Sequence, residues 1–160
     1  MRQQRSRIPG VRVWELLRHE DERGWLVELF RQDELGDPAM YPVMAYVSMT
    51  RPGVARGPHE HREQADLFCF LGPSDFELRL WDNRPDSPTY GQEERWLAGE
   101  SRPLAVFVPP GVVHGYRNIG SRDGLIINCP NRLYRGWGRQ EPVDEIRHEL
   151  DPQSPFRMAP

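Results

Sequence analysis

Short apolar runs alternate along the chain with clusters of Gly, Pro, Asn and Asp, and each run is five to seven residues long. Runs of this length with turn residues at their borders are typical of β-strands, and their regular spacing predicts an all-β sandwich or barrel. Helical periodicity is weak, so only short peripheral helices are expected, at residues 33–36 and 143–150. The predicted strands are residues 11–17, 25–30, 43–49, 67–71, 76–81, 104–108 and 125–129.

The chain is predicted to form a single domain over residues 1–160. A chain of 160 residues can bury a core of its own, and no internal repeat or linker divides it. We expect the core to span about residues 11–152 and the proline-rich residues 153–160 to form an extended tail.

Composition excludes several functional classes. The net charge of −3 gives no electrostatic reason to bind nucleic acid, and no apolar stretch has the length of a signal peptide or membrane span. Cys69 and Cys129 lie inside apolar runs, which predicts buried free thiols and a reducing, cytoplasmic setting. All 21 basic residues are arginine, so Schiff-base chemistry and a P-loop lysine are excluded.

Three of the five histidines form a pattern in two parts, His59-x-His61 and Pro109-x-Gly111-x2-His114. Side chains two residues apart on a strand share one face, so His59 and His61 can address one ligand. The Pro-x-Gly turn predicts that His114 begins a second strand. This two-part pattern resembles the paired motifs of the cupin superfamily, whose fold is a jelly-roll barrel, or double-stranded β-helix.

A cupin-like site would offer a metal the imidazoles of His59, His61 and His114, with Asp66 as the carboxylate. Such donors suit Zn, Fe, Mn, Ni or Co rather than Ca or Mg, although no cofactor is certain from the pattern. The alternative interpretation has no metal: His61 lines the barrel and His59 is a general base. His59 cannot be both a ligand and a free base, so the two interpretations exclude each other.

A second and longer resemblance rests on five runs that occur in one order along the chain. They resemble successive landmarks of the dTDP-4-dehydrorhamnose 3,5-epimerase family, which has the cupin fold, and they cover the chain from about residue 12 to residue 152. The runs are residues 21–28 (DERGWLVE), 56–59 (RGPH), 86–91 (DSPTYG), 108–116 (VPPGVVHGY) and 146–152 (IRHELDP).

The resemblance implies an epimerase that removes a proton beside the ketone of a nucleotide-linked 4-keto sugar. His59 then corresponds to the family's base, and Asp151 to the aspartate that orients this base. Arg56 corresponds to a substrate-binding arginine, while Arg23 and Glu28 correspond to residues that contact the nucleotide. The family also implies a homodimer in which the N-terminal segment crosses to the partner barrel.

The chain departs from this family at two positions. The family's enolate-stabilising lysine has no counterpart, because residues 64–67 read QADL and the chain has no lysine. Residues 125–129 read LIINC where the family has its catalytic tyrosine, and Tyr134 is the nearest tyrosine. A bound metal ion would replace the lysine as electrophile.

Three functional hypotheses follow from these patterns. The leading one is an epimerase or isomerase of a nucleotide-linked keto sugar, in which His59, Asp151 and Tyr134 are catalytic. The second is a metal-dependent cupin that isomerises, oxygenates or cleaves a small oxygen-rich substrate. The third is a sugar-binding cupin without catalytic activity. All three have a small-molecule partner and involve neither nucleic acid nor membrane.

Overall fold

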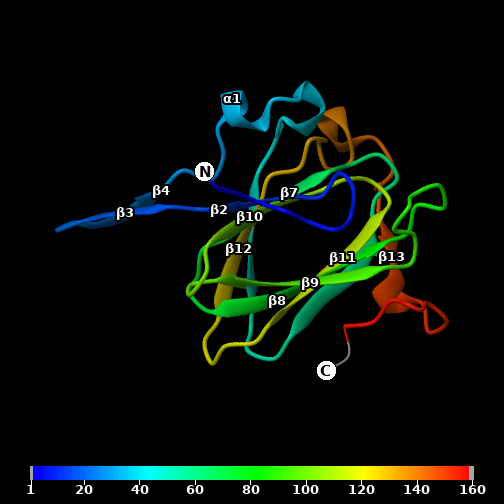
Figure 1. Ribbon diagram of the computed structural model, residues 1–160. Helices are drawn as coiled ribbons and strands as arrows, with labels where there is room; N and C mark the ends of the chain where they lie inside the picture. The colour runs from blue at the N-terminus through cyan, green and yellow to red at the C-terminus, as the bar shows by residue number, and fades with distance from the viewer. Residues whose placement is uncertain (1, 159–160) are drawn as a thin grey trace.

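The computed structural model describes residues 2–158 and contains two antiparallel β-sheets that face each other (Figure 1). Most successive strands cross from one sheet to the other, which confirms the predicted all-β jelly-roll barrel with short peripheral helices. The six-stranded sheet follows the order β1 (Arg2–Gln4), β2 (Arg12–Glu15), β10 (Leu104–Val108), β7 (Asp66–Phe70), β12 (Gly124–Asn128) and β5 (Tyr46–Thr50). The five-stranded sheet follows the order β13 (Ile146–Arg147), β6 (Ala55–Glu60), β11 (Val112–Asn118), β8 (Asp75–Asp82) and β9 (Glu93–Gly99).

Strand β7 is buried on both faces, which explains its continuous apolar sequence. Phe68 and Phe70 point into the core between the sheets, whereas Leu67 and Cys69 belong to a second apolar cluster on the outer face. Residues 32–40 pack against this outer cluster through Leu35 of α1 (Gln32–Leu35) and Met40 of η1 (Pro38–Met40). Cys69 and Cys129 are buried free thiols, as predicted.

The C-terminal residues cover the outer face of the five-stranded sheet. Met158 is buried against Trp81 and Val113, and the Trp81 and Phe156 ring centroids are 5.9 Å apart. The described part of the predicted tail, residues 153–158, is therefore packed on the barrel, and residues 159–160 lie outside the described chain. The sheet also begins before the predicted core boundary, because β1 pairs with β2.

A hairpin formed by β3 (Arg18–Asp21) and β4 (Gly24–Val27) projects away from the barrel (Figure 1). Its apolar side chains are largely exposed: Trp25 retains 53% and Leu26 62% of its accessible surface. The Arg18 guanidinium lies 5.2 Å from the Trp25 ring centroid, which is a cation–π contact.

The two predicted helices had different outcomes. Helix α1 forms where one was expected and ends at Gly36, whose φ of 74° is the left-handed conformation that glycine accepts. The helix predicted at residues 143–150 was wrong, because β13 pairs there with β6 and only the turn η3 (His148–Leu150) is helical. A further turn, η2, spans Trp137–Arg139. No helix within residues 2–158 is long and apolar enough to cross a membrane.

Candidate functional site

A cavity of about 1740 Å³ opens at one end of the barrel. Residues from both sheets line it, among them His59 from β6 and Tyr46 from β5. Much of its wall is the long connection between β12 and β13, within residues 130–145, and the turn after β6 also contributes residues 62–64. Deeper in the barrel, Phe68 lines the cavity and its ring centroid lies 5.3 Å from that of His114. Phe68 therefore marks the boundary between the apolar core and the polar end.

Strand pairing brings the three histidines together. His59 of β6 lies directly opposite His114 of β11 in the sheet register, and their ring centroids are 4.4 Å apart. His61 follows the end of β6 and shares the face of His59, with 5.4 Å between the ring centroids. The structure thus confirms that the His-x-His segment meets a second strand that carries His114.

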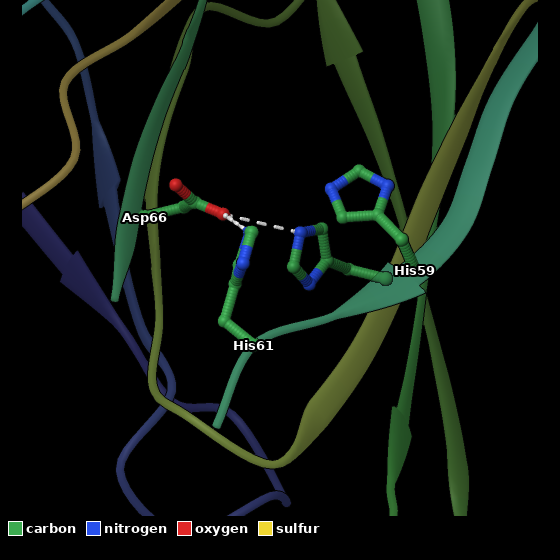
Figure 2. Close-up of side chains that lie close together, drawn as sticks. His59, His61 and Asp66 are labelled. Atoms are coloured by element: carbon green, nitrogen blue, oxygen red, sulfur yellow. Dashed lines mark ion pairs between the residues drawn. The ribbon is translucent and has the colours of Figure 1, made fainter. Parts of the chain in front are cut away.

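Asp66 reaches the histidines from the opposite sheet, at the first position of β7 (Figure 2). Its Oδ2 atom lies 3.1 Å from Nε2 of His61 and 3.2 Å from Nε2 of His114. Its Oδ1 atom accepts hydrogen bonds from the side-chain amides of Gln64 (2.9 Å) and Asn128 (2.8 Å). Together with His59, these side chains offer ligand atoms that all lie within 4.8 Å of one another.

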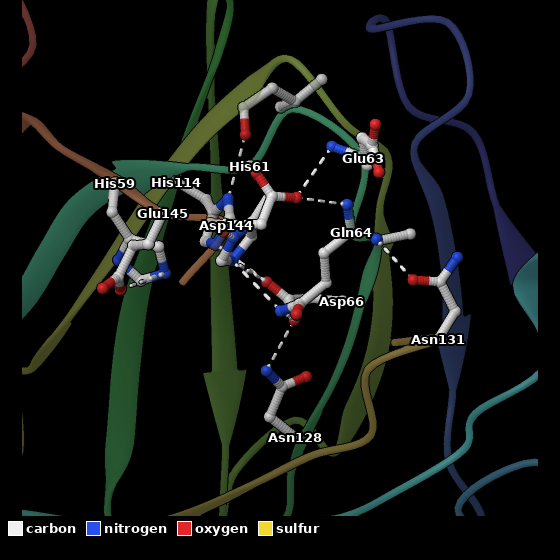
Figure 3. A network of polar contacts seen from close by, with 12 residues as sticks. His59, His61, Glu63, Gln64, Asp66, His114, Asn128, Asn131, Asp144 and Glu145 are labelled. Carbon is white, nitrogen blue, oxygen red and sulfur yellow. Dashed lines mark hydrogen bonds and ion pairs between the residues drawn. The ribbon is translucent and has the colours of Figure 1, made fainter. Parts of the chain in front are cut away.

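The backbone fixes the ring orientation of two histidines (Figure 3). Nδ1 of His61 contacts the carbonyl oxygen of Asp144, and Nδ1 of His114 lies 2.9 Å from the carbonyl oxygen of Val112. A carbonyl oxygen only accepts, so Nδ1 must carry the proton in both rings. In the neutral rings, each Nε2 atom therefore carries a lone pair rather than a proton, and lies close to Oδ2 of Asp66.

Asp144 also connects the 130–145 segment to the histidine strand through its carboxylate. This carboxylate accepts hydrogen bonds from the backbone N–H groups of Arg62 (3.0 Å), Glu63 (2.9 Å) and Gln64 (2.9 Å). Burial acts to raise the pKa of Asp144, but these three donors outweigh it and the pKa lies below its usual value. One residue thus holds both the His61 ring and the turn that follows it.

The electrostatic environment shifts the pKa values of His59 and His61 in opposite directions. Burial, followed by the neighbouring His114 and His61, holds the pKa of His59 well below its usual range. Burial also acts to lower the pKa of His61, but the Asp66 carboxylate outweighs it and the pKa of His61 is raised. Near neutral pH, His59 is therefore an uncharged imidazole with proton-accepting capacity at the cavity wall.

The other predicted residues fall into two groups. Arg56 and Tyr134 line the same cavity as His59, whereas Arg23, Glu28 and Asp151 do not. Arg23 is ion-paired with Asp21 on the projecting hairpin, and Glu28 lies near the hairpin's base, 3.6 Å from Arg31.

The expected contact between His59 and Asp151 is not formed within the described residues. The Asp151 carboxylate instead accepts a hydrogen bond from the backbone N–H of Gln153. Glu145 is the carboxylate that faces His59, with 4.0 Å between Oε1 and Nε2. The physical reason is the pairing of β13 with β6, which brings residue 145 beside the end of the histidine strand.

Two further side chains at the cavity were not predicted from the sequence as site residues. Glu145 gave no signal, because its contact with His59 depends on the course of a long connection. Tyr46 lies at an edge strand, and its hydroxyl accepts a hydrogen bond from Asn128 (2.9 Å), whose amide also binds Asp66. Burial raises the pKa of Tyr46 to about 12, so the hydroxyl stays protonated at neutral pH.

Comparison with known proteins places these features in a family. The dTDP-4-dehydrorhamnose 3,5-epimerase family model matches residues 5–136. The chain is 40% identical over 129 residues to a Haloferax volcanii protein named "Probable low-salt glycan biosynthesis epimerase Agl13", a match that covers 79% of this chain and 81% of that protein. It is 38% identical over 127 residues to the Bacillus subtilis spore coat polysaccharide biosynthesis protein SpsL, covering 79% and 82%.

A solved structure supports the fold. The Legionella pneumophila 3,5-epimerase RmlC, crystallised with dTDP-4-keto-L-rhamnose, superimposes with a TM-score of 0.77 over 98% of this chain and 84% of that chain, at 23% identity. The family match extends over most of the barrel strands and includes both histidine motifs. The chain belongs to the dTDP-4-dehydrorhamnose 3,5-epimerase family.

Proposed function

We propose that the protein epimerises a nucleotide-linked 4-keto sugar, with His59 as the base. The observation that carries this proposal is an uncharged imidazole at the wall of a large cavity, in a member of a sugar-epimerase family. The base would break a C–H bond beside the ketone and take the proton, while the electron pair moves to the ketone oxygen and forms an enolate. Return of a proton to the opposite face of that carbon inverts it.

Glu145 is the best candidate for the carboxylate that assists His59. Its Oε1 atom faces Nε2 of His59 at 4.0 Å, and its Oε2 atom is held by Arg147 at 2.6 Å. A carboxylate near an imidazole stabilises the imidazolium that forms when the base takes up a proton. In this proposal Glu145 has the role that the family resemblance assigned to Asp151.

Tyr46 is our first candidate for the acid, ahead of Tyr134. Its hydroxyl oxygen accepts from Asn128, which leaves its own proton free to be donated. Tyr46 belongs to the six-stranded sheet and His59 to the five-stranded sheet, and both line the cavity. Base and acid would then approach a sugar from opposite sides, which inversion requires. Tyr134 lines the same cavity with a similar exposure (55%, against 45% for Tyr46), but no hydrogen bond positions its hydroxyl within residues 2–158.

The diphosphate of a nucleotide sugar requires positive charge, and the cavity wall supplies arginines. Arg56 is oriented by hydrogen bonds to the Thr50 hydroxyl (3.0 Å) and the Met49 carbonyl oxygen (2.7 Å). Arg135 and Arg139 also line the cavity and form no ion pair within residues 2–158. Planar guanidinium groups suit bidentate contacts with phosphate oxygens.

In a homodimer, the residues of the projecting hairpin could contact a substrate bound in the cavity of the partner. Arg23 lies on the projecting hairpin, and Trp25 and Leu26 are largely exposed there. Exposed apolar side chains next to an arginine suit insertion into a second copy of the chain. We propose that Arg23 and Glu28 contact the nucleotide in the partner's cavity.

Hydrogen exchange in D2O tests the base and the acid separately. The wild-type protein should introduce deuterium beside the ketone of a dTDP-4-keto-6-deoxy sugar and release the inverted sugar, both observed by mass spectrometry and NMR. His59→Asn should slow exchange by about 10²–10⁴-fold, whereas His19→Asn, on the exposed hairpin, should not. Tyr46→Phe should retain exchange but lose inversion, and Tyr134→Phe should change neither.

Three results would contradict these assignments. Exchange by His59→Asn at the wild-type rate would exclude His59 as the base. Loss of inversion in Tyr134→Phe but not in Tyr46→Phe would reverse the assignment of the acid. Tight binding of dTDP without any exchange would identify the protein as a sugar-nucleotide binder.

A further inference from the structure

The side chains of His61, Asp66 and His114 form a compact group of potential metal-ligand atoms beside His59. Oδ2 of Asp66 lies 3.1 Å from Nε2 of His61 and 3.2 Å from Nε2 of His114. Yet Asp66 Oδ2 and His114 Nε2 have no hydrogen-bond partner within the described residues. At these distances the angles, rather than the separations, rule out a hydrogen bond. The atoms are close enough together to share one ligand, because they belong to a set that lies within 4.8 Å of one another.

We propose that His61, Asp66 and His114 together bind one divalent transition-metal ion. Two donors about 2.1 Å from a metal, at the angles of octahedral or tetrahedral coordination, lie about 3.0–3.4 Å apart. The two donor separations measured here fall within that interval. Two imidazole nitrogens and one carboxylate oxygen with open positions suit Zn, Mn, Fe, Co or Ni rather than Ca or Mg.

The surrounding contacts are those that a metal site needs. A ligating histidine donates its other ring N–H to a carbonyl or carboxylate, as His61 does to Asp144 and His114 does to Val112. The ligating carboxylate is itself hydrogen-bonded, here by Gln64 and Asn128 on the oxygen that faces away from the histidines. These contacts fix all three donor atoms before any ion arrives.

Burial makes a cation at this site energetically important. His114 is 2% exposed, Asp66 1% and His61 8%. With both rings neutral, the group holds one carboxylate charge and two unprotonated Nε2 atoms, and a buried acceptor without a partner costs about 1–3 kcal/mol. The Gln64 amide lies 3.3 Å from Nε2 of His61, but within the described residues no donor is hydrogen-bonded to Oδ2 of Asp66 or Nε2 of His114. A divalent ion would satisfy all three atoms at once.

His59 is left outside this set, although the sequence pattern included it. Its Nε2 atom faces Glu145, and no hydrogen bond orients its ring within residues 2–158. A three-residue site removes the conflict between ligand and base that a four-residue site creates. The ion-binding inference needs only the geometry, whereas its chemical consequence rests on the proposed function. A bound ion would polarise the ketone and stabilise the enolate, the task of the lysine that this chain lacks.

Elemental analysis of the untagged protein, after dialysis against zinc, manganese or cobalt chloride and gel filtration, tests the inference. We expect about one equivalent of metal per chain, and a visible absorption band for the cobalt form. Asp66→Asn and His114→Asn should each lose at least 90% of the bound metal, as roughly expected for loss of a ligand. The control variant His19→Asn and the base variant His59→Asn should both retain one equivalent.

Each other outcome has a defined meaning. Less than 0.1 equivalent in the reconstituted wild-type protein, on the order of background, would overturn the site. Metal loss in His59→Asn equal to that in Asp66→Asn would overturn the three-residue set. If Asp66→Asn does not fold, as judged by circular dichroism, His61→Gln at the cavity wall carries the same prediction. Bound metal without hydrogen exchange would contradict the proposed epimerase and leave the metal site intact.

Discussion

Two buried aspartates of this barrel have opposite environments. Asp82, at the end of β8, is fully buried, and both of its oxygens accept hydrogen bonds from Arg84, Ser87 and Thr89. Asp66 is 1% exposed, but only Oδ1 has hydrogen-bond partners (Figure 3). The first carboxylate is neutralised by its own loop, while the second directs one oxygen toward two imidazoles.

This difference separates a structural carboxylate from a functional one. Burial acts to raise the pKa of Asp82, but Arg84, Ser87 and Thr89 outweigh it and lower this pKa far below its usual value. Ser87 and Thr89 belong to the DSPTYG run at residues 86–91, so this family landmark closes a loop rather than forming the cavity wall. A satisfied polar group stabilises the fold, whereas an oxygen without a partner is available to a ligand.

The largest expected difference between the two aspartates is the effect of removing each charge on the rate of hydrogen exchange. Asp66→Asn should lower the hydrogen-exchange rate by about 10²–10³-fold, because the electrophilic site loses its anionic donor. Asp82→Asn should keep the wild-type rate per folded molecule. Exchange assays normalised to the folded fraction check this prediction, and equal losses in both variants would contradict it.

The free energy of unfolding should fall more in Asp82→Asn than in Asp66→Asn, which is the opposite of the order expected for activity. Asp82→Asn should lower the free energy of unfolding by about 2–4 kcal/mol, because the charged hydrogen bonds with Arg84 weaken and a buried donor loses its acceptor. Asp66→Asn should lower it by less than Asp82→Asn, by about 1 kcal/mol in metal-free protein, because Oδ2 has no hydrogen bond to lose and only its charge interaction with His61 is removed. Urea unfolding with both variants measures the difference, and a larger loss for Asp66→Asn would reverse the assignment.

The smallest expected effect is the pH dependence of the contribution that Asp82 makes to the free energy of unfolding. Its pKa is depressed in the folded state, so the unfolded chain binds more protons in acid and stability falls with falling pH. The contribution is complete above the unfolded pKa of about 3.9 and is lost as the pH falls through the folded pKa. The stability gap between wild type and Asp82→Asn should narrow from about pH 6 to about pH 3. A constant gap in urea unfolding would show that Asp82 is not the titrating group.

Much of the fold could be predicted because buried strands carry their own signal. The runs at residues 67–71 and 104–108 are apolar on both faces, and both are central strands. Strand β9 was not predicted, because it is an edge strand whose first three residues, Glu93, Glu94 and Arg95, are charged and interrupt the apolar pattern. The helix predicted at residues 143–150 failed because pairing with β6 outweighed a weak local preference.

The site was predictable only as far as strand geometry determines it. The spacing of His59 and His61, with His114 after a Pro-x-Gly turn, predicted one cluster, and β6 and β11 pair accordingly. Glu145 was beyond reach, because it meets His59 through a connection of irregular backbone across 86 positions of sequence. Tyr46 and Asn128 meet across paired strands β5 and β12, a register that the apolar pattern does not specify.

The double attachment of Asp144 has a mechanical consequence. Its carbonyl holds the His61 ring and its carboxylate holds the turn that follows, while Asp144 itself belongs to the wall of the cavity. In the proposed function, a sugar nucleotide that displaced this wall would also rotate the His61 ring or release the turn. The width of the cavity opening and the orientation of the His61 ring are therefore coupled through Asp144.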